Sequence, residues 1–238
     1  VGLGITTRFL EHGATVLICG RSEPETLPCV GDNTAEFFTL DVRDVDQIND
    51  FMAEAEARHG RLDVLVNNAG GAPMADAATA SPRFSEAIIR LNLIAPLNFA
   101  QAANRLMQKN EGGSIINIAS VSAVRPSPGT AAYGAAKAGL VNLATSLAVE
   151  WAPKVRVNSV IAGLIRTEQS HLHYGDEEGI REVGHTIPLN RMAVPTDIGD
   201  ACLFLASDLS SYVSGSTVTV HGGGEKPKFL DAANTNKA

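Results

Sequence analysis

The chain has 238 residues, of which 45% are hydrophobic and 19% are charged, and its formal net charge is −7. These values fit one soluble α/β domain with a sizeable core, and they argue against nucleic acid or an anionic membrane as a partner. No apolar run reaches the ~18 residues of a membrane span. Three cysteines without metal-ligand spacing favour a reducing, cytoplasmic setting.

Helical periods and short apolar runs alternate along the chain, beginning with a helix over residues 2–12. We expect strands at 14–19, 37–40, 62–66, 114–119, 155–161 and 217–220, and helices at 44–59, 88–103, around 133 and at 197–206. Residues 168–187 predict a mobile excursion, and residues 225–238 a loose C-terminal tail. This alternation predicts a mostly parallel sheet, which binds ligands at the carboxyl ends of its strands.

Tyr133 and Lys137 stand four residues apart in a segment with a helical apolar stripe. Both side chains therefore lie on one helix face, about one turn apart. A cation beside a tyrosine favours the phenolate, whose free pKa is about 10, so the pair predicts acid–base chemistry near neutral pH. On spacing alone, a surface pair without chemistry is the more frequent outcome.

A set of motifs strengthens the catalytic interpretation: Asn67-Asn68-Ala69-Gly70 after a strand, Ser120 at the end of another strand, Tyr133-x-x-x-Lys137, and Asn92. In this order and spacing the chain resembles the short-chain dehydrogenase/reductase family from Val1 to about Gly224. The resemblance implies a Rossmann-like doubly wound parallel sheet in a single domain, residues 1–224. It also implies a catalytic tetrad, whose members are Asn92, Ser120, Tyr133 and Lys137.

Chemical roles can be assigned to the members of this tetrad. Ser120 can donate a hydrogen bond to a substrate carbonyl, and Tyr133 can exchange a proton with the alkoxide. Lys137 would stabilise the phenolate and, by resemblance, hold the nicotinamide ribose. Pro96 lacks an N–H, so in a helix it leaves the carbonyl of Asn92 without its partner four residues on. The family uses such a carbonyl to bind a proton-relaying water, and a kink without a chemical role is the alternative.

Cofactor choice rests on Arg21, which follows Gly20 at the end of a predicted strand. Relatives that use NAD carry an acidic residue there, whereas a guanidinium matches a 2′-phosphate. We therefore expect NADP(H) in preference to NAD(H), with a solvated loop arginine as the alternative. The resemblance implies a wider set of cofactor contacts: Gly2, Arg21, Asp41, Val42, Asn68, Ala69, Gly70, Tyr133, Lys137, Ile165 and Thr167.

Two departures from the family pattern concern the start of the chain and the excursion. The family's first strand ends in a Thr-Gly-x-x-x-Gly-x-Gly turn, of which Val1-Gly2 match only the last two positions. The sheet would then lack a central strand, and we expect about 15–20 further N-terminal residues in the native protein. His171 and His173 have an H-x-H spacing, but no ligand cluster accompanies them, so no metal is expected. With Tyr174 they lie where the resemblance places a substrate lid.

Together these residues predict an oxidoreductase that transfers a hydride between NADP(H) and a carbonyl or secondary alcohol. A 3-oxoacyl thioester and a steroid-like cyclic alcohol both fit as the small-molecule substrate. A non-catalytic cofactor-binding sensor or scaffold is the alternative, although it would not need the full tetrad. A dehydratase or epimerase would need a larger C-terminal domain. The apolar helices that carry Asn92 and Tyr133 permit a homo-oligomer, either a tetramer or a dimer.

Overall fold

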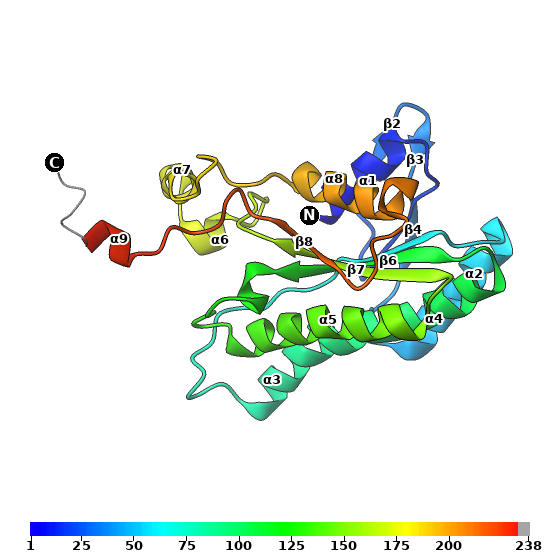
Figure 1. Ribbon diagram of the computed structural model, residues 1–238, viewed down its shortest axis with the longest axis horizontal. Coiled ribbons are helices and arrows are strands. Elements are labelled where there is room, and N and C mark those ends of the chain that lie inside the picture. Colours follow the sequence, from blue (N-terminus) through cyan, green and yellow to red (C-terminus); the bar gives the residue numbers. More distant parts are fainter. Residues whose placement is uncertain (233–238) are drawn as a thin grey trace.

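The computed structural model describes residues 1–232, except the side chain of Asp231. Six strands run in parallel pairings within a layer between two sets of helices (Figure 1). One group has the order β5, β6, β7 and β8, and the other pairs β1 with β4. Their bounds are β1 (Leu17–Gly20), β4 (Glu36–Thr39), β5 (Val64–Asn67), β6 (Gly113–Ser120), β7 (Val155–Ala162) and β8 (Thr217–Val220). The expected α/β architecture with a parallel sheet is confirmed.

Helices cover both faces of the sheet (Figure 1). One face carries α1 (Gly2–Glu11) and α8 (Pro195–Ala206), and the other carries α2 (Val45–His59), α4 (Ala95–Lys109) and α5 (Ala131–Glu150). Helices α1 and α8 approach closely because Gly4 has no side chain: a Cβ there would lie 2.4 Å from the backbone of Pro195. The two faces bury separate apolar clusters, one around Ile116, Val160 and Ile198 and the other around Ile115 and Met107.

Local sequence signals explain where several helices begin and end. The carboxylate of Asp44 accepts hydrogen bonds from the backbone N–H groups of Asp46 and Gln47 at the start of α2. Gly60 ends α2 with a φ of 72°, a conformation that glycine adopts without a steric penalty. Ser81 caps α3 (Pro82–Ile89) by accepting from the N–H of Phe84.

Four features of the chain differ from the sequence-based expectation. A small antiparallel hairpin joins β2 (Cys29–Val30) to β3 (Asn33–Thr34), where no strands were expected. The predicted excursion contains α6 (His171–Tyr174) and α7 (Glu177–His185), and the predicted tail contains α9 (Phe229–Ala232). The long helix expected through residue 103 is divided into α3 and α4 by a π-helical turn, η1 (Arg90–Ile94). The rest of the tail, 233–238, lies outside the described residues.

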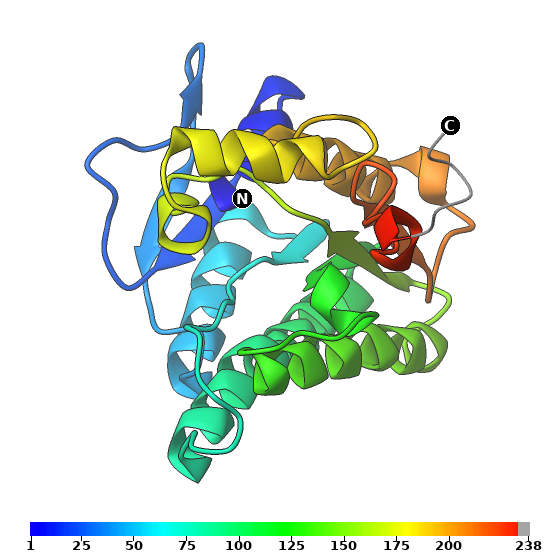
Figure 2. The same cartoon turned by 90° about the vertical axis from the view of Figure 1, so that its left-hand side faces the viewer.

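The catalytic motifs lie at the carboxyl edge of the sheet, where the first 3₁₀ turn and the short helices α6 and α7 are also found. Figure 1 shows α6 and α7 on this side of the strands, and Figure 2 looks onto it. The turn η2 (Val121–Ala123) directly follows β6, and η3 (Asp208–Ser210) follows α8. Among the described residues, no helix has the length and apolar character that crossing a bilayer requires.

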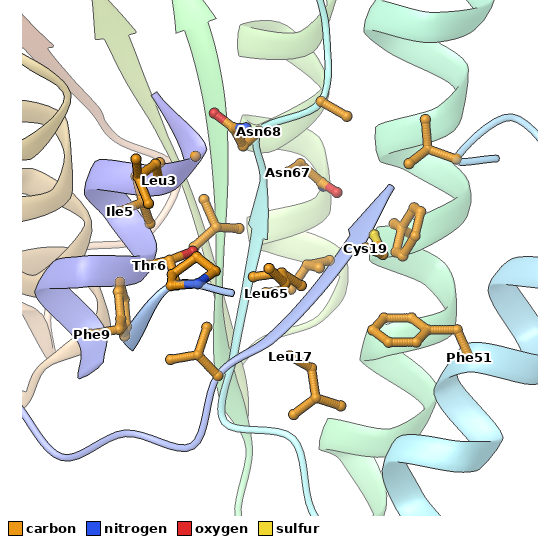
Figure 3. Close-up of a pocket in the computed structure, with 18 of the residues that line it drawn as sticks. Leu3, Ile5, Thr6, Phe9, Leu17, Cys19, Phe51, Leu65, Asn67 and Asn68 are labelled. Atoms are coloured by element: carbon orange, nitrogen blue, oxygen red, sulfur yellow. The ribbon is translucent and has the colours of Figure 1, made fainter. Parts of the chain in front are cut away.

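The sheet is interrupted between β1 and β5. Within the described residues, β1 pairs only with β4, and β5 pairs only with β6. A cavity of about 520 Å³ separates the two facing strand edges (Figure 3).

Candidate active site

A cleft of about 510 Å³ opens at the carboxyl edge of β6 and β7, next to α5. Ser120 is the last residue of β6, while Tyr133 and Lys137 come from the first two turns of α5. All three line the cleft, as do Asn68, Ala69, Gly70, Ile165 and Thr167. The fold thus brings together most of the predicted site residues, although they come from distant parts of the sequence.

Tyr133 is held against Ser120 at one wall of the cleft. Burial of the phenol raises the pKa of Tyr133, and this effect is larger than the influence of the nearby Ser120 hydroxyl, which lowers that pKa. The expectation that Lys137 depresses the pKa of Tyr133 is therefore wrong for the protein alone. The lysine Nζ lies over the tyrosine ring, 5.7 Å from its centroid, and donates a hydrogen bond to the carbonyl of Ile118 at 2.8 Å.

Lys137 is a cation in an unusually buried place. Only 3% of the residue is exposed, and burial lowers the pKa of its ammonium to about 8. The cause is desolvation, which disfavours the charged form. Near neutral pH the side chain is therefore still mostly protonated, but its charge is costly to maintain.

Asn92 is fully buried within η1 and connects the π-helical turn to the loop after β5. Its Nδ2 donates to the carbonyls of Gly71 and Ile88, and its Oδ1 accepts from the N–H of Gly71, each at 2.9 Å. Gly70 lies between Asn92 and Lys137, because a Cβ on Gly70 would be 2.6 Å from Asn92 Oδ1 and 3.1 Å from Lys137 Nζ. The two predicted tetrad members thus border the same loop.

The predicted adenosine contacts lie at the ends of the neighbouring strands β1 and β4. Arg21 is exposed just after β1, and its charge contributes to lowering the pKa of Asp41, which follows β4. The larger cause is Arg43, whose Nε donates to Asp41 Oδ1 at 2.9 Å, and the carboxyl pKa falls to about 2. Sequence reasoning missed Arg43, although its position two residues after Asp41 was a usable signal. Val42 lines the interstrand cavity rather than the cleft.

Other residues line or support the cleft in addition to the predicted contacts. Val1, Glu168 and Gln169 also line the cleft, and the last two directly follow the predicted contact Thr167. Gly163 packs closely on His221, since a Cβ on the glycine would lie 2.7 Å from that of the histidine. Asn67 is buried and donates to Asn117 Oδ1 at 2.9 Å and to the carbonyl of Pro96 at 3.1 Å, which fixes the loop behind the site.

The predicted lid residues lie on and around α6. His171 Nδ1 is 3.0 Å from the carbonyl oxygen of Glu168, and the ring of His173 lies 6.0 Å from that of Tyr174. In the part of the chain that the structure describes, no three His, Cys, Asp or Glu side chains are grouped as a metal would require. Arg125, from the loop after Ser120, forms an ion pair with Glu225 at 2.8 Å.

The chain is similar in sequence and structure to several known proteins. Residues 1–225 match a family model described as Enoyl-(Acyl carrier protein) reductase. The 3-oxoacyl-(acyl-carrier-protein) reductase FabG of Thermotoga maritima is 35% identical over 231 residues, covering 94% of this chain and 92% of that protein. A 3alpha-hydroxysteroid dehydrogenase of Mediterraneibacter gnavus is 32% identical over 231 residues, covering 93% and 91%. A gluconate 5-dehydrogenase from Burkholderia cenocepacia, solved with NADP and tartrate, is 29% identical with a TM-score of 0.83, covering 98% and 91%.

Proposed function

Because the chain belongs to the short-chain dehydrogenase/reductase family, whose members oxidise CH–OH groups or reduce C=O groups, we propose that it interconverts a carbonyl and a secondary alcohol with NADP(H). The observation that carries the proposal is the grouping of Ser120, Tyr133 and Lys137 in one cleft, where the Ser120 hydroxyl acts on the phenol of Tyr133. A binding module without turnover would have no need of this set.

The residues around the cleft fit the nicotinamide half of the cofactor. Lys137 brings a buried ammonium to its wall, and a ribose hydroxyl is a suitable acceptor for that donor. Gly70 leaves the floor of the cleft without a side chain next to this lysine. When bound, the nicotinamide supplies the hydride for reduction or accepts it in oxidation.

In carbonyl reduction, Ser120 would donate a hydrogen bond to the substrate oxygen and Tyr133 would transfer its proton to the same atom. Burial raises the pKa of Tyr133, which keeps the phenol protonated at neutral pH, as an acid requires. Lys137 would stabilise the phenolate that remains, and the carbonyl of Asn92 would hold a water that returns the proton. Pro96 has no N–H to donate to that carbonyl.

Arg21 supports NADP(H) as the preferred cofactor. Its guanidinium lies beyond the carboxyl end of β1, near Asp41, where it could pair with a 2′-phosphate. Asp41, whose pKa is lowered in part by the charge of Arg21, is already paired with Arg43. The similar gluconate 5-dehydrogenase, which was solved with NADP, is consistent with this preference.

Two substrate classes are supported by the relatives. Similarity to a 3-oxoacyl-(acyl-carrier-protein) reductase favours a 3-oxoacyl thioester, and similarity to a 3alpha-hydroxysteroid dehydrogenase favours a cyclic alcohol. We place either reaction in the cytoplasm, within a homotetramer or homodimer. His171, His173 and Tyr174 would contact the substrate from the lid side.

A spectrophotometric screen at 340 nm with NADPH and NADH, against a panel of 3-oxoacyl thioesters and cyclic ketones, tests the proposal. Oxidation of NADPH is expected, and Tyr133→Phe should reduce kcat by about 10²–10⁴-fold while cofactor fluorescence still reports binding. Cofactor binding without turnover on any substrate would favour the sensor or scaffold. Full activity of Tyr133→Phe would contradict the mechanism.

A further inference from the structure

Arg125 is held close to the catalytic serine by a compact turn and has no role in the cofactor site described above. The N–H of Arg125 donates to the carbonyl of Val121 at 3.1 Å, and the N–H of Ser122 donates to Ser120 Oγ at 3.2 Å. The backbone of Arg125 is therefore tied to the wall of the cleft that Ser120 lines. Because Ser120 is the residue proposed to bind the substrate carbonyl, a cation fixed beside it lies where it can act on the substrate.

The guanidinium of Arg125 has an incomplete set of partners. One Nη donates to the carbonyl of Pro126 at 2.9 Å, and the other pairs with the carboxylate of Glu225 at 2.8 Å. Its Nε is buried, yet it has no hydrogen-bond partner among the described residues. A buried charged donor without a partner is costly, and a carboxylate can accept from two N–H groups of one guanidinium at once. A carboxylate that also reached Nε would satisfy this group more fully than Glu225 does.

Glu225 is bound to Arg125 weakly. It follows the run of glycines at 222–224, each of which has a positive φ, and its side chain is 48% exposed. An ion pair this open to solvent contributes little to stability, because water and salt screen it. The exchange of Glu225 for another carboxylate therefore costs little. Glu225 also shows that a carboxylate fits against this guanidinium.

The lid brings a tyrosine to the same two charges. Tyr174, at the end of α6, is half-buried and packs against the small apolar cluster around Ile180. Burial raises the pKa of its phenol, and to a lesser degree Arg125 lowers that pKa and Glu225 raises it, so both charged groups lie near the phenol. The loop after η2, α6 and the chain after β8 thus meet at Arg125, and Figure 1 shows all three beyond the carboxyl ends of the strands.

Apolar side chains stay exposed beside these polar groups. Val124 precedes Arg125, and Leu172 lies on α6 two residues before Tyr174. Leu189 lies against the glycine turn after β8. Each of these three apolar residues is 67% exposed. Apolar lining with a few placed polar groups is typical of a site for a small organic molecule. The surroundings of Arg125 therefore match a carbon skeleton that ends in a negative charge.

We propose that Arg125 selects the substrate by binding a carboxylate at the end away from the reacting carbonyl, and that this carboxylate displaces Glu225 from the guanidinium. The inference rests on the proposed oxidoreductase function and narrows its substrate class to oxo acids and hydroxy acids with an apolar chain or ring between the two groups. Tyr174 would donate a second hydrogen bond to the carboxylate, since its raised pKa keeps the phenol protonated.

Matched ketones test the proposal: a series of increasing chain length, each member ending in a carboxylate or in the corresponding primary amide. The measured quantity is kcat/KM for the carboxylate divided by that for the amide, with whichever nicotinamide cofactor the enzyme uses. At the best chain length Arg125→Gln should lower this ratio about 10–100-fold, because charge-assisted hydrogen bonds are lost. Glu225→Gln removes the competing carboxylate and should raise the ratio severalfold.

Arg61→Gln is the matched control for these variants. Arg61 is also an exposed arginine in an ion pair, with Asp63, but it precedes β5 at the opposite edge of the sheet, so its removal should leave the ratio unchanged. A wild-type ratio near one at every chain length would overturn the proposal. So would a ratio that Arg125→Gln leaves as it is in the wild type.

The NMR signal of the Arg125 Nε–H group gives a second measurement that needs no turnover. The signal is identified by its loss in Arg125→Gln. Addition of the carboxylate ketone should shift it, the matched amide should not, and Glu225→Gln should shift at a lower ketone concentration. A selective shift without turnover would support the carboxylate site and refute the oxidoreductase function. Turnover of both ketones with no shift, or with equal shifts, would support that function and overturn the role of Arg125.

Discussion

At the scale of single residues, the site depends on a lysine that is expensive to bury. Lys137 is 3% exposed, and its pKa falls to about 8 from an ordinary 10.5. Because the folded-state pKa is the lower of the two, the unfolded chain binds the proton more tightly. Between these two pKa values the unfolded chain keeps a proton that the folded chain has released, so stability rises with pH in this window. Below this window, Lys137 is protonated in both the folded and the unfolded chain, and its burial destabilises the folded chain by the full amount.

The first prediction concerns Lys137→Met, which removes this titration. Without cofactor, the free energy of unfolding of the wild type should rise relative to the variant by up to roughly 3 kcal/mol between about pH 7 and pH 10.5. Urea unfolding at several pH values measures the difference. Lys109→Met, which removes a lysine with 61% of its side chain exposed, is the matched control for the loss of one positive charge. A flat curve for Lys137→Met would show that the lysine is not desolvated.

The second prediction separates two guanidinium groups near the adenosine end. Charge-assisted hydrogen bonds contribute about 1.5–3 kcal/mol, so Arg21→Ala should raise the KM for NADPH about 10–100-fold and leave that for NADH nearly unchanged. Arg43→Ala is the comparison, because Arg43 is paired with Asp41. Steady-state kinetics with both cofactors gives the result. If only Arg43→Ala raises the KM for NADPH, then Arg43, and not Arg21, binds the 2′-phosphate.

At the scale of secondary structure, the π-helical turn η1 presents Asn92 to the site. The N–H of Ala95 donates to the carbonyl of Arg90, five residues back, and Pro96 then supplies no donor to Asn92. A wider turn and a missing donor thus coincide at one predicted catalytic residue. Such turns occur frequently at functional sites, which fits the proposed water-binding role of the Asn92 carbonyl.

The third prediction tests that role with Pro96→Ala. The new N–H lies four residues after Asn92 and can donate to its carbonyl, so the proposed water would lose its acceptor. We expect kcat to fall about tenfold while the thermal midpoint stays equal or rises, because proline is a poor residue within a helix. The solvent deuterium isotope effect on kcat should also change, which a purely structural role would not cause. Unchanged kcat would contradict the relay.

The sequence predicted long, strongly patterned elements and the residues at their ends. The buried runs of β6 and β7 and the strip of α5 that carries Tyr133 agree with the structure because local periodicity reports burial. The strands of the β2–β3 hairpin are two residues each, too short for any alternation to be visible. The turn η1 depends on a choice between hydrogen bonds four and five residues apart, which local sequence does not encode.

The effect of burial on the pKa values at the site could not be predicted from the sequence. The spacing of Tyr133 and Lys137 correctly placed both on one face of α5, but it suggested that the lysine would lower the tyrosine pKa. Burial of Tyr133 in the cleft has the opposite effect, because desolvation of the phenol outweighs the influence of the Ser120 hydroxyl on its pKa. Desolvation is a property of the folded surroundings, and the spacing of two residues carries no information about it.

At the scale of the whole molecule, the outer face of α5 suggests how copies of the chain would associate. Its exposed residues are uncharged along most of the helix: Ala131, Ala135, Asn142, Thr145, Ser146 and Val149, before Glu150 at its end. Val149 is 81% exposed. A helix that is apolar or neutral on every side is typical of an element that packs on both faces, which supports the proposed homo-oligomer.

The last prediction places a charge on this face. Light scattering of the wild type should give two or four times the 25.0 kDa of one chain, and Asn142→Glu should give 25.0 kDa, because a like charge meets its copy across a symmetric interface. Ala53→Glu, at an exposed position of α2, is the matched control and should leave the mass unchanged. If Asn142→Glu keeps the wild-type mass while Ala53→Glu lowers it, the interface lies on α2 instead. A wild type that is already monomeric at micromolar concentration would contradict the oligomer itself.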